Sequence, residues 1–91
     1  MKKITAFYLE GCPYCKQARE ALKELKNENE NYSEILIEWI EENQHPEISE
    51  KFDYYYVPSM FIENKKFYES HRGEKFEECK ENIKRVLDAA K

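Results

Sequence analysis

Two cysteines separated by two residues carry the strongest chemical signal in the sequence. They form the segment Cys12-Pro13-Tyr14-Cys15, and this spacing places two thiols about one helical turn apart if the segment is helical. Paired thiols exchange with disulfides. One thiolate attacks the substrate and forms a mixed disulfide with it, and the second thiol then attacks this mixed disulfide and releases the reduced substrate. The same spacing supplies half of a structural zinc site, so both chemistries have to be considered.

A zinc site needs two further ligands at suitable spacing. Only Cys79, His45 and His71 remain as thiol or imidazole ligands, and none of them is paired with another in the sequence. The sequence therefore favours disulfide exchange, with no metal expected. We expect both histidines on the surface and Cys79 as a buried structural thiol on the inner face of the last helix.

The elements on either side of the cysteines predict where the two thiols lie. A short apolar run over residues 4–9 is typical of a buried strand, and Gly11 ends it. Apolar residues then recur at helical spacing to about Glu28, with Pro13 suited to the first turn. Cys12 is thus expected at the helix N-terminus, where free amides and the helix dipole favour a thiolate, and Cys15 on the buried stripe.

The rest of the chain predicts three more strands and two more helices. The patterns favour strands over Ser33–Ile40, Tyr54–Ile62 and Lys66–Ser70, a short helix over Glu47–Phe52, and a final helix opened by Gly73. We expect Trp39 in the core and Tyr54, Tyr55 and Tyr56 packed in the sheet. The strand–helix–strand start implies a parallel pair, and the later hairpin adds antiparallel strands. The prediction is an α/β fold of order β-α-β-α-β-β-α, with a four-stranded mixed sheet flanked by helices.

The composition limits the function classes that fit. Ninety-one residues suit a single domain, residues 1–91, and the 41% of apolar residues suffice for a core. A net charge of −4 without a basic block argues against binding to nucleic acid or to an anionic membrane. No apolar run approaches the roughly 20 residues of a membrane helix, and no secretory signal is visible. Three cysteines, an odd number, indicate thiols in a reducing compartment, so a cytoplasmic protein is expected.

Two segments together resemble the glutaredoxins of the thioredoxin superfamily. The first is the Cys12–Cys15 motif after a strand ending Phe7-Tyr8-Leu9, and the second is Val57-Pro58 before Ser59-Met60-Phe61-Ile62. The resemblance covers nearly the whole chain in the order expected of the small bacterial type. It implies a thioredoxin fold, a cis proline at Pro58, and a thiol–disulfide oxidoreductase that uses glutathione as its co-substrate.

The resemblance also implies roles for individual residues. Cys12 attacks the disulfide, Cys15 resolves the mixed disulfide, and Val57 pairs its backbone with the substrate beside Pro58. The predicted substrate- or glutathione-binding residues are Tyr14, Lys16, Val57, Pro58, Arg72, Gly73 and Glu74. Among them, Gly73 and Glu74 lie where the family holds the γ-glutamyl end of glutathione.

The sequence departs from the glutaredoxin pattern in three segments. Leu9 and Glu10 stand where many members place a cation for the glycine carboxylate, and Tyr56 replaces the usual Thr before Val-Pro. The Gly-Gly segment of the family, which Asp or Thr follows, reads Arg72-Gly73-Glu74 here. Lys16, Arg72 or Lys75 is therefore expected to supply the positive charge. These departures leave a redoxin reduced by a thioredoxin reductase as the alternative function. An iron–sulfur cluster carrier is a further alternative, although Pro13 and Tyr14 fit it poorly. The predicted partners are disulfide-containing proteins, with ribonucleotide reductase or a thioredoxin reductase as candidates, and the chain is expected to be a monomer.

Overall fold

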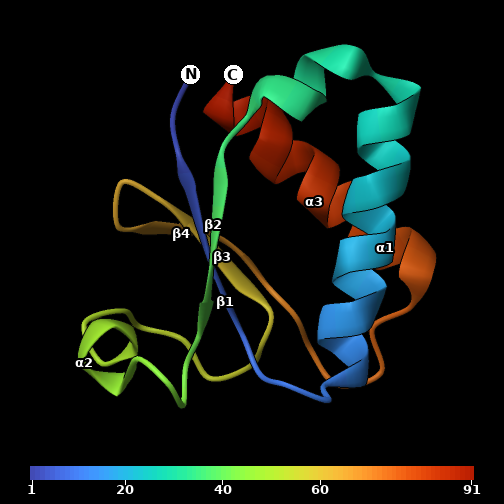
Figure 1. The fold of residues 1–91 in the computed structure, drawn as a ribbon. Coiled ribbons are helices and arrows are strands. Elements are labelled where there is room, and N and C mark those ends of the chain that lie inside the picture. Colours follow the sequence, from blue (N-terminus) through green and yellow to red (C-terminus); the bar gives the residue numbers. More distant parts are fainter.

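The computed structural model describes all residues, 1–91, and contains four strands, three α-helices and one 3-10 helix (Figure 1). In chain order these are β1 (Ile4–Tyr8), α1 (Pro13–Glu28), the 3-10 helix (Glu30–Glu34), β2 (Ile37–Glu41), α2 (Pro46–Ser49), β3 (Ser59–Ile62), β4 (Lys65–Glu69) and α3 (Phe76–Ala90). None of the helices combines the length and the apolar composition needed to cross a membrane.

The four strands form one mixed sheet in the order β2-β1-β3-β4. Strands β1 and β2 are parallel, as the intervening helix α1 requires, and Ala6 lies opposite Trp39. Strand β3 runs antiparallel to both β1 and β4. The predicted α/β fold with a four-stranded mixed sheet and the element order of a thioredoxin fold is therefore confirmed.

Helices α1 and α3 cover one face of the sheet, and the short α2 lies near the other face (Figure 1). The main core fills the space under α1 and α3 with sixteen buried residues, among them Ile4, Leu22, Met60, Ile83 and Leu87. Burial of the apolar stripes of these two helices supplies most of the hydrophobic stabilisation of the fold.

The opposite face carries a smaller aromatic cluster. Phe7, Ile40 and Phe61 are buried there, with Phe52 and Tyr54 among the partly buried side chains packed against them. The rings of Phe52 and Tyr54 each lie 4.9 Å from the ring of Phe7. This cluster fixes the chain between α2 and β3, which leads directly to Val57 and Pro58.

Strand β2 begins later than the sequence pattern predicts. Residues Ser33 and Glu34, expected in the strand, belong to the 3-10 helix that follows α1. The side chain of Asn29 accepts a hydrogen bond from the amide of Asn31, and the Ser33 hydroxyl bonds to the carbonyl of Glu30. Side-chain hydrogen bonds of this kind compete with extended backbone, so they override the alternating pattern at Ser33.

The predicted strand over Tyr54–Ile62 is wrong in its first half, since β3 begins only at Ser59. The carboxylate of Glu69 accepts hydrogen bonds from the backbone amides of Tyr55 and Tyr56, at 2.6 and 2.8 Å, in place of a neighbouring strand. The expectation that all three tyrosines pack in the sheet is also wrong. Tyr54 joins the aromatic cluster, but the Tyr55 and Tyr56 side chains are 88% and 55% exposed.

The structure also differs from the sequence prediction at the ends of three elements and in the burial of one side chain. Strand β1 stops at Tyr8 rather than Leu9, and β4 covers Lys65–Glu69 rather than residues 66–70. Helix α2 covers Pro46–Ser49 instead of residues 47–52, since Pro46 takes a first-turn position that needs no amide hydrogen. Trp39 packs against the core but is only partly buried.

The core under α3 predicts a stability difference between two leucines. Leu87 is fully buried in α3, whereas Leu36 is 65% exposed just before β2. Leu87→Ala should lower the free energy of unfolding by about 2–5 kcal/mol, because it removes buried methyl groups and leaves a cavity. Leu36→Ala should change it by no more than about 0.5 kcal/mol. Urea unfolding of both variants measures the difference, and equal losses would contradict the described packing.

Candidate active site

Cys12 lies at the N-terminal cap of α1, as the sequence predicts. Gly11 makes the turn from β1 with a φ of 77°, a conformation that residues other than glycine rarely adopt. Cys12 then has extended backbone angles, and Pro13 is the first helical residue. The Cys12 Sγ accepts a hydrogen bond from the amide of Cys15 at 3.4 Å. This half-buried sulfur therefore faces the positive end of the helix dipole.

Cys15 lies one turn further along α1 and is only 3% exposed. Burial raises the pKa of its thiol to about 12, and the neighbouring sulfur of Cys12 adds to the increase. A backbone hydrogen bond at Leu9 and the positive charge of Arg19 act in the opposite direction. At neutral pH the site therefore pairs an accessible sulfur at Cys12 with a protonated, sheltered thiol at Cys15.

Val57 and Pro58 lie beside the first cysteine. The Val57–Pro58 peptide bond is cis, as the resemblance implies. The Cys12 Sγ lies 3.9 Å from the carbonyl oxygen of Val57, within the range of a weak hydrogen bond in which the thiol donates. The fold thus brings together two segments that are 45 residues apart in the sequence.

Tyr14 contacts the loop that precedes α3. The amide of Gly73, whose φ is 85°, donates a hydrogen bond to the Tyr14 hydroxyl at 2.7 Å. The side chain of Gln17 donates a second hydrogen bond to the carbonyl of Glu74 at 3.1 Å. The amide of Gly73, a residue predicted to bind substrate or glutathione, therefore already donates to Tyr14. A ligand has to displace this hydroxyl in order to reach the amide.

The Glu74 carboxylate points into the protein and is 4% exposed. One of its oxygens accepts hydrogen bonds from the hydroxyls of Tyr68 and Ser70, and the other lies 3.4 Å from the Asn82 amide. This network satisfies the side chain and fixes the loop. The main chain of Glu74 is also engaged, since its amide donates to the carbonyl of His71 and its carbonyl accepts from Gln17. A substrate can therefore bind to Glu74 only by replacing one of these partners.

Cys79 is fully buried next to this network, with its sulfur 3.4 Å from the Tyr68 hydroxyl. Burial raises the pKa of the Cys79 thiol to about 11, and the carboxylates of Glu74 and Glu78 add to the increase. A protonated and inaccessible thiol agrees with the structural role predicted for Cys79.

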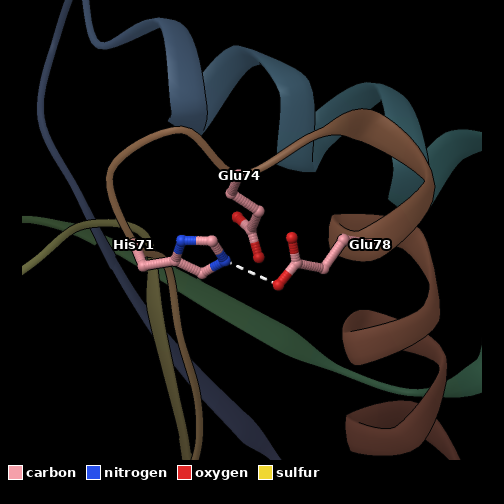
Figure 2. Close-up of side chains that lie close together, drawn as sticks. All are labelled: His71, Glu74 and Glu78. Atoms are coloured by element: carbon pink, nitrogen blue, oxygen red, sulfur yellow. Dashed lines mark hydrogen bonds and ion pairs between the residues drawn. The ribbon is translucent and has the colours of Figure 1, made fainter.

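His71, Glu74 and Glu78 form the one group of potential metal ligands in the structure (Figure 2). Their ligand atoms lie within 4.8 Å of one another, and the His71 Nε2 lies 2.6 Å from a carboxylate oxygen of Glu78. This hydrogen bond raises the pKa of His71. His71 and Glu78 satisfy each other, and Glu74 is bonded to Tyr68 and Ser70, so the group is complete without an ion.

A hollow of about 390 Å³ opens beside the two cysteines. The end of β1, the following loop and the first two turns of α1 form it, and its lining includes Tyr8, Leu9, Cys12, Cys15, Lys16 and Arg19. Of the predicted cations, Lys16 lines this hollow, whereas Arg72 and Lys75 do not. A larger hollow of about 510 Å³ near Lys3 and Asn64 contains no thiol, so the smaller one is the candidate active site.

Two contributors to this site were not predicted from the sequence. Arg19 lies seven residues after Cys12 and three after Lys16, so the three residues share one face of α1. That spacing is visible in the sequence and could have indicated Arg19. Glu41 could not have been found in this way, because only the parallel pairing of β2 with β1 brings it to the loop before Cys12.

Glu41 anchors the loop before Cys12 through a buried carboxylate at the end of β2. It accepts hydrogen bonds from the amide of Glu10 at 3.3 Å and from the amides of Asn43 and Gln44. Burial alone raises the pKa of this carboxyl group, but the three amides outweigh burial and the pKa is lowered overall. The charged form of Glu41 therefore stabilises the folded state.

This shift predicts an acid-dependent loss of stability. The contribution of Glu41 is complete above the usual pKa of 4.5 and is lost as the pH falls through the lower pKa of the folded state. Glu41→Gln should be less stable than the wild type at pH 7 and should lose less stability as the pH is lowered from 7 through the range below 4.5. Urea unfolding across this range is the measurement. The exposed Glu20→Gln serves as control and should follow the wild type, whereas a Glu41→Gln curve parallel to the wild type would contradict the assignment.

Comparisons with known proteins place the chain in a family. Residues 7–72 match the family model described as glutathione S-transferase, N-terminal domain. Protein TlpB from Flavobacterium psychrophilum is 42% identical over 41 residues, which are 45% of this chain and 11% of TlpB. The chain thus spans only a small part of the length of that relative.

Two solved structures share the fold. Thioredoxin 1 from Thermosipho africanus superimposes with a TM-score of 0.57 at 24% identity, over 96% of each chain. The zinc-bound form of human ERp44 superimposes with a TM-score of 0.55 at 16% identity, over 93% of this chain and 26% of ERp44. Both matches support the thioredoxin fold that the resemblance to glutaredoxins implies. Since the family model covers more than half of the sequence, the chain belongs to the glutathione S-transferase N-terminal domain family.

Proposed function

We propose that this protein is a glutathione-dependent thiol–disulfide oxidoreductase of the glutaredoxin type, which reduces protein disulfides and glutathione mixed disulfides. The observation that carries the proposal is the difference between its two thiols. Cys12 is half-exposed at a helix N-terminus, whereas Cys15 is buried with its pKa raised to about 12. One accessible sulfur next to one sheltered thiol suits attack followed by resolution.

In the first step the Cys12 thiolate attacks one sulfur of the substrate disulfide. A new S–S bond joins Cys12 to that sulfur as the old S–S bond breaks, and the second sulfur leaves as a thiolate that takes a proton from water. Before the attack the Cys12 sulfur accepts a hydrogen bond from the Cys15 amide at the helix N-terminus. The Val57 carbonyl lies 3.9 Å from Cys12 Sγ, and we propose that the backbone of Val57 aligns the substrate there.

In the second step Cys15 gives up its proton to solvent and attacks the sulfur of Cys12. The intramolecular disulfide forms, and the substrate sulfur leaves as a thiolate. Two of the causes that raise the pKa of Cys15 are the hydrogen bond and the charge of Cys12. Both disappear once Cys12 is in a mixed disulfide, so the pKa of Cys15 falls when its thiolate is needed.

In the last step two glutathione molecules reduce the Cys12–Cys15 disulfide. The first forms a mixed disulfide with Cys12 and releases Cys15, and the second removes the first as oxidised glutathione. The family name supports glutathione as the reductant, since it describes a domain of glutathione S-transferases. We propose that the protein acts as a cytoplasmic monomer, with disulfide-containing proteins such as ribonucleotide reductase as its partners.

The alternative reductant is a thioredoxin reductase. Two observations favour it: Leu9 stands where many glutaredoxins place a cation, and the Tyr14 hydroxyl occupies the Gly73 amide. The structural likeness to thioredoxin 1 extends over 96% of the chain, although at 24% identity it supports the fold alone. In this alternative the chemistry at Cys12 and Cys15 is unchanged, and only the source of electrons differs.

The two cysteines should respond differently to substitution. Cys12→Ser should abolish all disulfide exchange, because no other accessible thiol can attack. Cys15→Ser should retain reduction of glutathione mixed disulfides and lose reduction of protein disulfides, which requires the second thiol. Turnover of both substrate types measures this, with Cys79→Ser as a control that should stay within about twofold of the wild type, because its thiol is buried and protonated. Equal and total loss in both active-site variants would contradict the assigned roles.

The reductant can be identified by coupling turnover to NADPH. One assay contains glutathione with glutathione reductase, and the other contains thioredoxin reductase without glutathione. We expect rapid reduction of a small glutathione mixed disulfide in the first assay only, because the proposed mechanism regenerates Cys12 with glutathione. Turnover confined to the second assay, with a protein disulfide as acceptor, would establish the alternative.

A further inference from the structure

The hollow beside Cys12 and Cys15 contains a cation that the proposed reaction does not yet use. The guanidinium carbon of Arg19 lies 4.4 Å from the centre of the Tyr8 ring and 5.1 Å from the centre of the Trp39 ring. These two rings meet edge to face, with their centres 6.0 Å apart. Attraction between the cation and the faces of both rings restricts the side chain to the wall of the hollow.

Arg19 has no protein partner for its hydrogen-bond donors. Neither Arg19 nor Lys16, the other cation of the hollow, forms an ion pair or a side-chain hydrogen bond in the structure. Lys80, by contrast, bridges Glu24 and Glu28 of α1 at 3.0 and 2.6 Å. The five N–H donors of Arg19 are therefore free, and their planar fork matches a carboxylate that binds through both oxygens.

The local charge also favours an anionic ligand. The hollow is lined by two cations, Lys16 and Arg19, and by one carboxylate, Glu10, so its local charge is positive. The whole chain, by contrast, has a net charge of −4. A positive site next to the reactive sulfur in an otherwise acidic protein concentrates anionic substrates where they react. Because the rings of Tyr8 and Trp39 already restrict Arg19, binding costs it less conformational entropy.

We propose that Arg19 binds a carboxylate of the disulfide substrate and is thereby a specificity-determining residue of this site. The inference rests on the proposed function and adds the class of substrate to it: a disulfide that carries a carboxylate near its sulfur. Arg19 supplies the positive charge that Leu9 and Glu10 do not, and it does so from α1 rather than from the loop before Cys12. The carboxylate belongs either to a small thiol such as glutathione or to an acidic side chain of a protein.

The test compares disulfides that differ only in their carboxylates. Oxidised glutathione is paired with its fully methyl-esterified form, and a disulfide-linked peptide with Glu beside its cysteine is paired with its Gln counterpart. Rate constants for attack by Cys12 are measured in a Cys15→Ser background, which removes any effect of Arg19 on Cys15. The variants are Arg19→Gln, Arg19→Lys and, as the matched control, Lys23→Gln, which removes an exposed cation of α1 outside the hollow.

Arg19→Gln should slow the reaction with a carboxylate-bearing disulfide about tenfold, the lower end of the loss expected for a hydrogen bond between charged groups. It should leave the rate with the neutral counterpart within about twofold. Arg19→Lys should restore part of the rate, and added salt should reduce the difference in rate between the wild type and Arg19→Gln.

Selectivity confined to the glutathione pair assigns the carboxylate to a small thiol, and selectivity confined to the peptide pair assigns it to a protein. Equal effects on charged and neutral substrates in both pairs, or no effect, would overturn the role of Arg19. If Cys12 attacked none of the disulfides, the proposed function itself would fail.

Discussion

The proposed thiol chemistry depends on one structural constraint, the position of the Cys12 sulfur at the N-terminus of α1. The free amides at a helix start stabilise a negative charge only within about the first turn. A shift of Cys12 by one turn would therefore remove this stabilisation. The fold fixes the position from three directions: Gly11 makes the turn from β1, Pro13 begins the helix, and Glu41 holds the backbone at Glu10.

The difference between the two thiols follows from the same helix. Cys12 precedes the first turn and remains accessible, whereas Cys15 faces the sheet and loses contact with water. Desolvation raises the pKa of Cys15 and keeps its thiol protonated at neutral pH. A single amphipathic helix thus positions both sulfurs, one accessible and one buried.

The two sides of the site differ in how fully their polar groups are used. On the side of Gly73, Tyr14 occupies the backbone amide, and Glu74 is bonded to Tyr68 and Ser70. On the side of the hollow, Arg19 lies against two aromatic rings with its donors free. Available hydrogen-bonding capacity is therefore concentrated on the hollow side of Cys12, where a charged substrate group gains most from binding.

The sequence by itself determined the order of elements, the mixed sheet and the places of Cys12 and Cys15, because these depend on local periodicity and on turn residues. The cis bond before Pro58 followed from the family resemblance rather than from any local pattern. Tertiary structure decided what depends on distant partners. The amides of Tyr55 and Tyr56 bond to the Glu69 carboxylate instead of to a neighbouring strand, so these residues lie outside β3. The pairing of β2 with β1 places Glu41 beside the loop before Cys12. The placement of Arg19 in the hollow was decided in the same way, since it lies over Tyr8 of β1 and Trp39 of β2, two strands that only the folded sheet pairs. Hydrogen bonds and ring contacts between residues far apart in sequence leave no periodic signal, so only the folded chain shows them.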